Sequence, residues 1–171
     1  IGFMRQLMEV STAMNLIGPG PAEHHFMDAR GAVAALGARG LWADLGSGAG
    51  FPGIALAIHN PDAQVLLVES RERRAGFLKQ VVRAAGLDNA EVFHGRTASI
   101  SGPFDGIISR AYRPLADYLA DAGRLLGQTG EAVSMTGEGE LSAVPDGWIV
   151  TESWTYTVDA GRRSAHRLRR A

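Results

Sequence analysis

Short apolar runs alternate with longer amphipathic segments from residue 41 onward. Continuous apolar runs are typical of strands covered by helices on both faces, and apolar residues at helical spacing indicate the helices themselves. This alternation predicts an α/β fold with a doubly wound, Rossmann-like, mostly parallel sheet. The predicted strands are residues 41–45, 65–68, 90–93, 106–109 and 131–135, and the predicted helices between them are residues 52–59, 71–85 and 114–126.

The two ends of the chain carry other patterns. Apolar residues near helical spacing predict N-terminal helices over 3–17 and 22–36, with a break over 18–21 where glycine and proline alternate. Residues 148–158 alternate between apolar and polar side chains, which predicts a late antiparallel strand, and the tail from Arg163 is able to pair with it.

The stretch from Asp44 to Gly53 joins the first predicted strand to its helix. Glycine stands at every second position of its loop, at 46, 48 and 50, where it lets the backbone turn sharply and approach a ligand. A proline then follows at a position suited to the first turn of a helix. A strand, a glycine loop and a helix in this order are typical of a nucleotide-binding unit.

A second acidic residue, Glu69, ends the second predicted strand. In this topology it lies beside the glycine loop and is able to accept both hydroxyls of an adenosine ribose. Dinucleotide sites use the spacing G-x-G-x-x-G, whereas the glycines here alternate as Gly-Ser-Gly-Ala-Gly. That spacing resembles motif I of the class I methyltransferases, which bind S-adenosyl-L-methionine.

Composition bounds the remaining possibilities. The 171 residues are 46% hydrophobic and 20% charged, so we expect a single domain over 1–171, with N-terminal helices over 1–37 and the Rossmann-like core over 38–171. The absence of cysteine excludes a disulfide framework and a thiolate nucleophile.

No apolar run is long enough to span a membrane and no signal peptide opens the chain, so we expect a cytoplasmic monomer. Since the chain begins at Ile1, we also expect part of the natural N-terminus to be missing.

Charge is distributed unevenly although the net charge is only -1. Lys79 is the only lysine, so the positive charge comes from arginine, which binds phosphates and base edges through two donors at once. A neutral protein with local basic patches is able to bind RNA, but solvated helix faces would show the same clusters. The candidate RNA contacts are Arg73, Arg74, Arg113, Arg162 and Arg163.

Two adjacent histidines on the predicted helix over 22–36 raise the question of a metal site. Adjacent side chains on a helix point in different directions, and only His25 and Asp28 share a face. We therefore expect a local hydrogen bond here and no metal.

Several segments together resemble the glucose-inhibited division protein B family. Phe51-Pro52-Gly53 follows the glycine loop as in that family, and the segment from Phe104 to Ala111 is similar to its strand-four signature, Ser-Arg-Ala included. His25 to Asp28 and the segment from Val68 to Leu78 fall in the same order. The family comprises guanine-N7 methyltransferases of small-subunit (16S) ribosomal RNA, and the resemblance runs from about residue 14 to residue 137.

The resemblance implies the roles of individual residues. Arg110 would face the place where the cofactor meets the target base and would position the substrate, while Thr97 and Ala98 would lie by the adenine. The full set expected to bind S-adenosyl-L-methionine is Asp44, Gly46, Gly48, Gly50, Phe51, Glu69, Thr97, Ala98 and Arg110. For Phe51 the alternative is packing in the core, and for Arg110 it is a structural ion pair.

The chemistry of guanine N7 agrees with what the chain contains. The ring nitrogen attacks through an available lone pair, so the enzyme needs positioning more than a general base.

One departure from the family pattern is Thr136, which stands where the family commonly has a lysine. Two alternatives therefore stay open: a non-catalytic protein that binds S-adenosylmethionine or a nucleotide, and an NAD-dependent oxidoreductase, which the glycine spacing disfavours.

Overall fold

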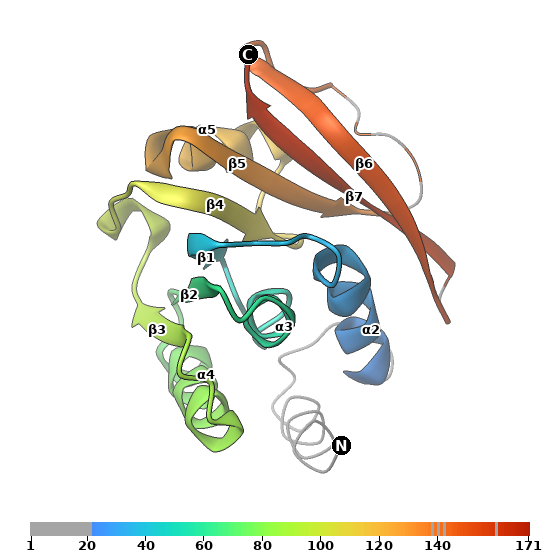
Figure 1. Cartoon of the computed structure of the whole chain (residues 1–171). Helices are drawn as coiled ribbons and strands as arrows, with labels where there is room; N and C mark the ends of the chain where they lie inside the picture. The colour runs from blue at the N-terminus through green and yellow to red at the C-terminus, as the bar shows by residue number, and fades with distance from the viewer. Residues whose placement is uncertain (1–21, 138, 140, 142, 160) are drawn as a thin grey trace.

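The computed structural model describes residues 22–137, 139, 141, 143–159 and 161–171. This part of the chain folds into a seven-stranded sheet in the order β3-β2-β1-β4-β5-β7-β6, with helices on both faces (Figure 1). The strands are β1 (Gly40–Leu45), β2 (Ala63–Glu69), β3 (Ala90–His94), β4 (Phe104–Ser109), β5 (Leu126–Thr136), β6 (Trp148–Val158) and β7 (Gly161–Arg170). The helices are α2 (Ala22–Val33), α3 (Gly53–His59), α4 (Glu72–Ala85), the short 3₁₀ turn η1 (Thr97–Ser99) and α5 (Leu115–Leu125).

Strand direction confirms the predicted fold class. The first five strands pair in parallel, whereas β7 runs antiparallel to both of its neighbours, β5 and β6. The last strand in the sequence is therefore inserted between the two strands that precede it. This insertion distinguishes the sheet from the 3-2-1-4-5-6 order typical of dinucleotide-binding domains.

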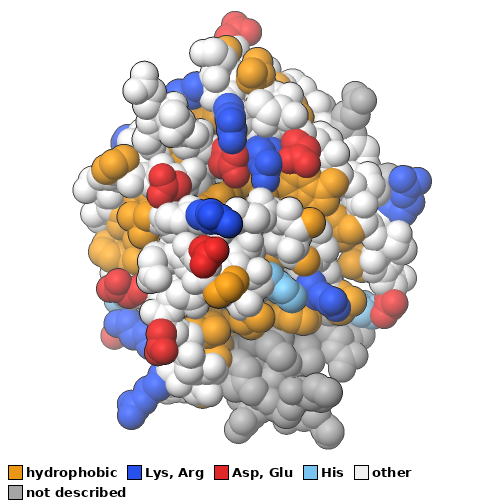
Figure 2. All heavy atoms as spheres, viewed as in Figure 1, with side chains coloured by type: hydrophobic (Ala, Val, Ile, Leu, Met, Phe, Trp, Pro, Cys, Tyr) orange, Lys and Arg blue, Asp and Glu red, His pale blue; other side chains and the backbone are white. Residues whose placement is uncertain are grey.

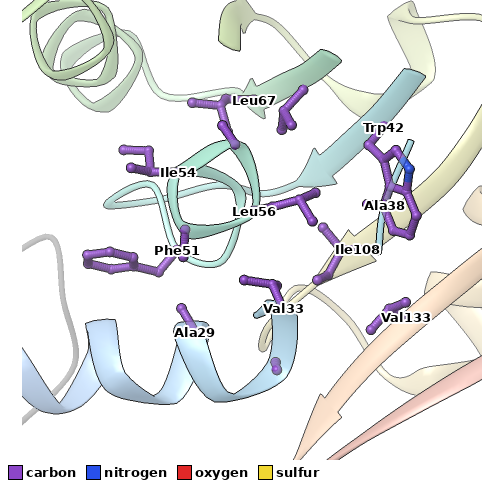
Figure 3. Close-up of a cluster of buried hydrophobic side chains, with 14 of the residues drawn as sticks. Ala29, Val33, Ala38, Trp42, Phe51, Ile54, Leu56, Leu67, Ile108 and Val133 are labelled. Carbon is purple, nitrogen blue, oxygen red and sulfur yellow. The ribbon is translucent and has the colours of Figure 1, made fainter. Parts of the chain in front are cut away.

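Alternating side chains of the sheet build two cores. On one face, Trp42, Leu67 and Ile108 pack under α2, α3 and α4, as Figure 3 shows for the layer between α2 and α3. On the other face, Leu45 and Ile107 pack under α5. Because successive residues of a strand point to opposite faces, a continuous apolar run such as β1 serves both cores.

The structure moves some predicted boundaries. The helix predicted over 22–36 ends at Val33, because the amide Nδ2 of buried Asn60 donates to the Val33 carbonyl oxygen at 3.1 Å and closes that end of α2. The fifth strand begins at Leu126, five residues before the predicted start, and directly follows α5. Residues 127–130 read Gly-Gln-Thr-Gly, so they lack the apolar pattern of a strand. The helix predicted over 3–17 and the break over 18–21 lie outside the described residues.

Candidate active site

The glycine loop lies at the carboxyl end of β1, beside the point where the strand order reverses between β1 and β4. Two of its glycines, Gly46 and Gly50, have φ angles of 70° and 99°, which residues with a Cβ rarely adopt. The backbone N–H groups of Gly46 and Ser47 both donate to the Val68 carbonyl oxygen at 3.0 Å. The loop is thus fixed to the end of β2 by its own backbone.

Glu69 lies against this loop with only 5% of its surface exposed. Its Oε2 accepts a hydrogen bond from the Gly48 N–H at 3.0 Å, and its Oε1 accepts one from the Arg71 N–H at 2.8 Å. Each carboxylate oxygen has a second lone pair for a further donor. The carboxylate is therefore held in a fixed orientation beside the glycine loop, where the sequence predicts a ribose contact.

Asp44 is buried at the end of β1, on the face covered by α3. Its Oδ2 accepts a hydrogen bond from the Gly53 N–H at the start of α3, at 2.9 Å. Burial raises the pKa of this carboxyl from 3.8 to about 7, although the hydrogen bond from Gly53 opposes the shift. Its other oxygen, Oδ1, is buried and has no hydrogen-bond partner within the described part of the chain. Such an atom is suited to receive a donor from a ligand.

A cavity of about 360 Å³ opens beside the glycine loop and Glu69's strand. Three residues predicted to bind the cofactor, Gly46, Thr97 and Ala98, line it together. Two further lining residues, Tyr112 and Asp121, were not predicted as cofactor contacts, because neither belongs to a motif and α5 brings Asp121 to the cavity from a distant part of the chain. Predicted cofactor residues from two separate loops, after β1 and after β3, therefore meet at one cavity.

Arg110 follows β4 and lines a second cavity, of about 410 Å³. Its Nη1 lies 3.3 Å from Asp28 Oδ2 and 3.4 Å from the His25 carbonyl oxygen. The other carboxylate oxygen of Asp28 accepts a hydrogen bond from the Tyr156 hydroxyl at 2.8 Å. His25 and Asp28 both contact Arg110 from α2, and the local hydrogen bond expected between these two residues stays a prediction.

Thr136 lies on the rim of the same cavity, together with Arg163. Its hydroxyl lies 3.0 Å from Nε2 of His166, and Nδ1 of that histidine lies 2.8 Å from the Ser153 hydroxyl. His166 is only 2% exposed. The position where the resembled family has a lysine is therefore occupied by a neutral group connected to three strands of the sheet.

Phe51 belongs to the core cluster shown in Figure 3 and lines neither of these two cavities. It is 4% exposed, and its ring meets that of Phe26 edge-on, with 6.1 Å between the centroids. This is the packing alternative raised by the sequence. Its contact with the cofactor stays a prediction.

The arginine clusters divide into two groups in three dimensions. Those late in β7 bind within the molecule: Arg167 pairs with Glu131 and Glu152, Arg169 with Glu131, and Arg170 donates to two backbone carbonyls of β5. The predicted RNA contacts at Arg73, Arg113 and Arg162 are exposed, and Arg163 lines the second cavity. Arg74 lies instead beside the glycine loop, where a Cβ placed on Gly48 would be 4.0 Å from its Nη1.

The described residues give two further findings. No group of three or more His, Cys, Asp or Glu side chains within them converges in a way that would hold a metal ion. No helix within the same residues is long and apolar enough to cross a bilayer.

Comparison with known proteins identifies the family. The family model described as rRNA small subunit methyltransferase G, or GidB, matches residues 1–159. The chain belongs to this family. The rRNA small subunit methyltransferase G of Azoarcus sp. strain BH72 is 37% identical over 150 residues, which cover 85% of this chain and 71% of that protein. The corresponding protein of Marinobacter nauticus is 39% identical over 130 residues, covering 73% of this chain and 61% of that protein.

Solved structures confirm the fold of this member of the rRNA small subunit methyltransferase G family. An O-methyltransferase from Bacillus cereus in complex with SAH superposes with a TM-score of 0.69 at 19% identity, covering 100% of this chain and 91% of the other. TrmN from Thermus thermophilus gives a TM-score of 0.61 at 19% identity, covering 91% and 55%. The Rossmann-like sheet is thus that of class I methyltransferases, and family membership makes S-adenosyl-L-methionine the cofactor expected at the glycine loop.

Proposed function

We propose that this chain transfers the methyl group of S-adenosyl-L-methionine to N7 of a guanine in small-subunit (16S) ribosomal RNA. The observation that carries the proposal is a row of adjoining cavities along the carboxyl ends of the strands. The cavity beside Gly46 shares Tyr112 and Arg113 with a middle cavity of about 360 Å³. The middle cavity in turn shares Met135 and Thr136 with the cavity at Arg110. A cofactor and a base are therefore able to lie side by side along this edge.

The residues at the glycine loop fit the cofactor. Glu69 offers acceptor oxygens to the two ribose hydroxyls, and the buried Asp44 Oδ1 lacks a donor that the cofactor's ammonium group would supply. The glycine backbone leaves room for close approach. When bound, the cofactor supplies an activated methyl group on a sulfonium. The chain's part is then to hold that group and the base in line and to exclude water.

The groups near Arg110 favour a ring-nitrogen acceptor, which needs no proton removed. Both oxygens of the Asp28 carboxylate are engaged, one by Arg110 and one by Tyr156. Burial and the neighbouring Asp28 raise the pKa of the Tyr156 hydroxyl, so it stays protonated and donates. This network orients Arg110, whose guanidinium is suited to guanine O6 or to a flanking phosphate.

Thr136 leaves the cavity without the lysine of the resembled family, but a positive charge is still present. Arg163 lines the same cavity from β7, the strand that neighbours β5. We infer that Arg163 supplies the charge that would otherwise come from position 136. A positive charge kept in this cavity favours an active enzyme over a protein that only binds the cofactor.

A methyl-transfer assay tests the proposal, with radiolabelled S-adenosylmethionine and either bare 16S RNA or small-subunit particles from cells lacking this activity. We expect incorporation into 16S RNA and 7-methylguanosine in its nucleoside digest. Calorimetry with S-adenosylmethionine and with NAD accompanies the assay. Cofactor binding with no methyl transfer on any substrate would favour the non-catalytic alternative, and binding of NAD alone would favour an oxidoreductase.

We also propose that the chain acts as a monomer in the cytoplasm, where ribosomal RNA is accessible to it. Sedimentation equilibrium with and without S-adenosylmethionine checks this, and a dimer at micromolar concentration would contradict it.

A further inference from the structure

We propose that Asp121 reads the exocyclic amine of adenine and so determines which base the cofactor pocket accepts. This inference rests on the proposed function, because it assigns the cavity beside Gly46 to the adenine of S-adenosyl-L-methionine. No sequence motif points to Asp121, which lies on α5, far along the chain from the glycine loop.

The position of the cavity relative to Glu69 places the adenine. Glu69 is fixed at the loop by Gly48, and the cavity begins at the neighbouring residues Val68 and Ser70. It ends on the opposite side at Thr97 and Ala98, which follow β3. A base attached to a ribose at Glu69 would therefore enter this cavity.

The wall of the cavity on the α5 side is polar. Asp121 Oδ2 lies 3.1 Å from the Tyr112 hydroxyl, and that hydroxyl lies 2.8 Å from Thr97 Oγ1. A carboxylate only accepts, so the phenol donates to Asp121 and accepts from the Thr97 hydroxyl. Tyr112 thus connects both sides of the cavity and orients the Asp121 carboxylate.

Asp121 keeps acceptor capacity for a ligand. Its two protein contacts, to Tyr112 and to Arg113 Nη1 at 3.6 Å, are both made by Oδ2. A carboxylate accepts about four hydrogen bonds in all. Its side chain is 20% exposed, so it is partly shielded from water and yet within reach of a ligand in the cavity.

A separate contact fixes the distance across the cavity. The guanidinium of Arg124, one turn after Asp121 on α5, donates to the carbonyl oxygens of Thr97 and Ile100 at 2.7 and 2.9 Å. The turn that carries Thr97 and Ala98 is therefore tied to the helix that carries Asp121. A pocket held in this way is able to discriminate between bases by hydrogen bonding rather than by size alone.

Adenine matches this wall because its 6-amino group is a donor. In hypoxanthine the same position carries a carbonyl oxygen, which would face the Asp121 carboxylate with lone pairs on both sides. A pocket that pairs with a ligand donor rejects the analogue without it, because its own polar group is left unpaired. The pocket should therefore prefer the 6-amino base strongly over the 6-oxo base.

The test compares S-adenosylhomocysteine with its 6-oxo analogue by calorimetry, so the readout is binding and not activity. We expect the native chain to bind the 6-amino compound at least tenfold more tightly. In Asp121→Asn, the amide is able to donate to a 6-oxo group, and the preference should fall to about threefold or less. Tyr112→Phe, which keeps the ring and removes the hydroxyl, should reduce the preference part of the way.

Asp117→Asn is the matched control, because Asp117 lies on the same helix, is exposed and lines none of the three cavities. It should keep the native preference. An unchanged preference in folded Asp121→Asn would overturn the assignment of Asp121 while leaving the proposed function intact. Failure of the native chain to bind S-adenosylhomocysteine at all would instead overturn the proposed function and this inference together.

Discussion

Arg110 holds two elements together and also lines the cavity proposed for the base. Its ion pair with Asp28 joins the end of β4 to α2, and both side chains are about four-fifths buried, at 21% and 17% exposed. Removing one partner of such a pair leaves the other charge partly buried and unpaired, which costs more than breaking a surface pair. Experiment separates the structural role of Arg110 from the positioning role proposed for it.

Arg110→Ala should lower methyl transfer to ribosomal RNA by about 100-fold, because the base loses its positioning group. The free energy of unfolding should fall by only about 1–3 kcal/mol, since the lost hydrogen bonds are partly exposed. Asp28→Asn is the matched variant: it removes the same ion pair but keeps Arg110. If both variants lose activity and stability to the same degree, the role of Arg110 is structural.

Asp44 should make the stability of the protein depend on pH. Its folded pKa of about 7 lies above the unfolded value of 3.8, so the folded state binds the proton more tightly. The stability from this residue is complete below about pH 4 and is lost as the pH rises through 7. Thermal melts from pH 5 to pH 8 should show this loss, and Asp44→Asn should reduce it. An identical slope in the variant would contradict the role of Asp44.

At the scale of elements, the arginines of β7 lie at its two ends. Arg169 pairs with Glu131 on β5, whereas Arg162 and Arg163 lie near the start of the strand, at the edge that carries the cavities. On the face shown in Figure 2, acidic and basic side chains are interspersed. The sequence clusters alone do not reveal which arginines already have acidic partners.

Replacing Arg162 and Arg163 together by glutamine should weaken RNA binding and reduce its salt dependence. Each phosphate contact contributes about 0.7–0.9 to the slope of log affinity against log salt, so the slope should fall by roughly 1.5. Filter binding between 50 and 300 mM salt measures it. Replacing Arg169 and Arg170 together by glutamine is the control, since it removes the same number of charges from the other end of β7, and an equal fall in slope there would exclude a specific role for Arg162 and Arg163.

At the scale of the whole molecule, β7 lies inside the sheet, between β5 and β6. Leu168 and Ala165 of β7 are fully buried in the two cores, one on each face. Arg167 Nη2 also donates to the Leu36 carbonyl oxygen at 2.9 Å, which fixes the segment after α2. The C-terminal segment is therefore part of the fold rather than an appended basic tail.

Deletion of residues 162–171 should therefore abolish cooperative unfolding rather than only weaken RNA binding. The deletion leaves β5 and β6 without their common neighbour and exposes both cores. Near-ultraviolet circular dichroism and a thermal melt measure this. A truncated chain that keeps a sharp transition would show that β7 contributes little to stability. For the same reason, point substitutions are the better test of RNA contacts.

The pattern of local residues determined much of this protein. Apolar runs give the strands of the parallel sheet, because burial between helix layers requires them to be apolar on both faces. The alternating glycines and the acid at Glu69 identify the cofactor loop, since both lie at strand ends that the topology brings to one edge. The motifs at Phe51 and Arg110 also point to the family that the comparison identifies.

Only the tertiary structure decided which distant residues meet. Three features depend on long-range packing: β7 lies between β5 and β6, Arg110 pairs with Asp28, and Asp121 lines the cavity beside the glycine loop. Local spacing carries no signal for such contacts, because their geometry is set by how whole elements pack. The glycine loop and its acid could therefore be predicted from the sequence, whereas the wall that would recognise the base could not.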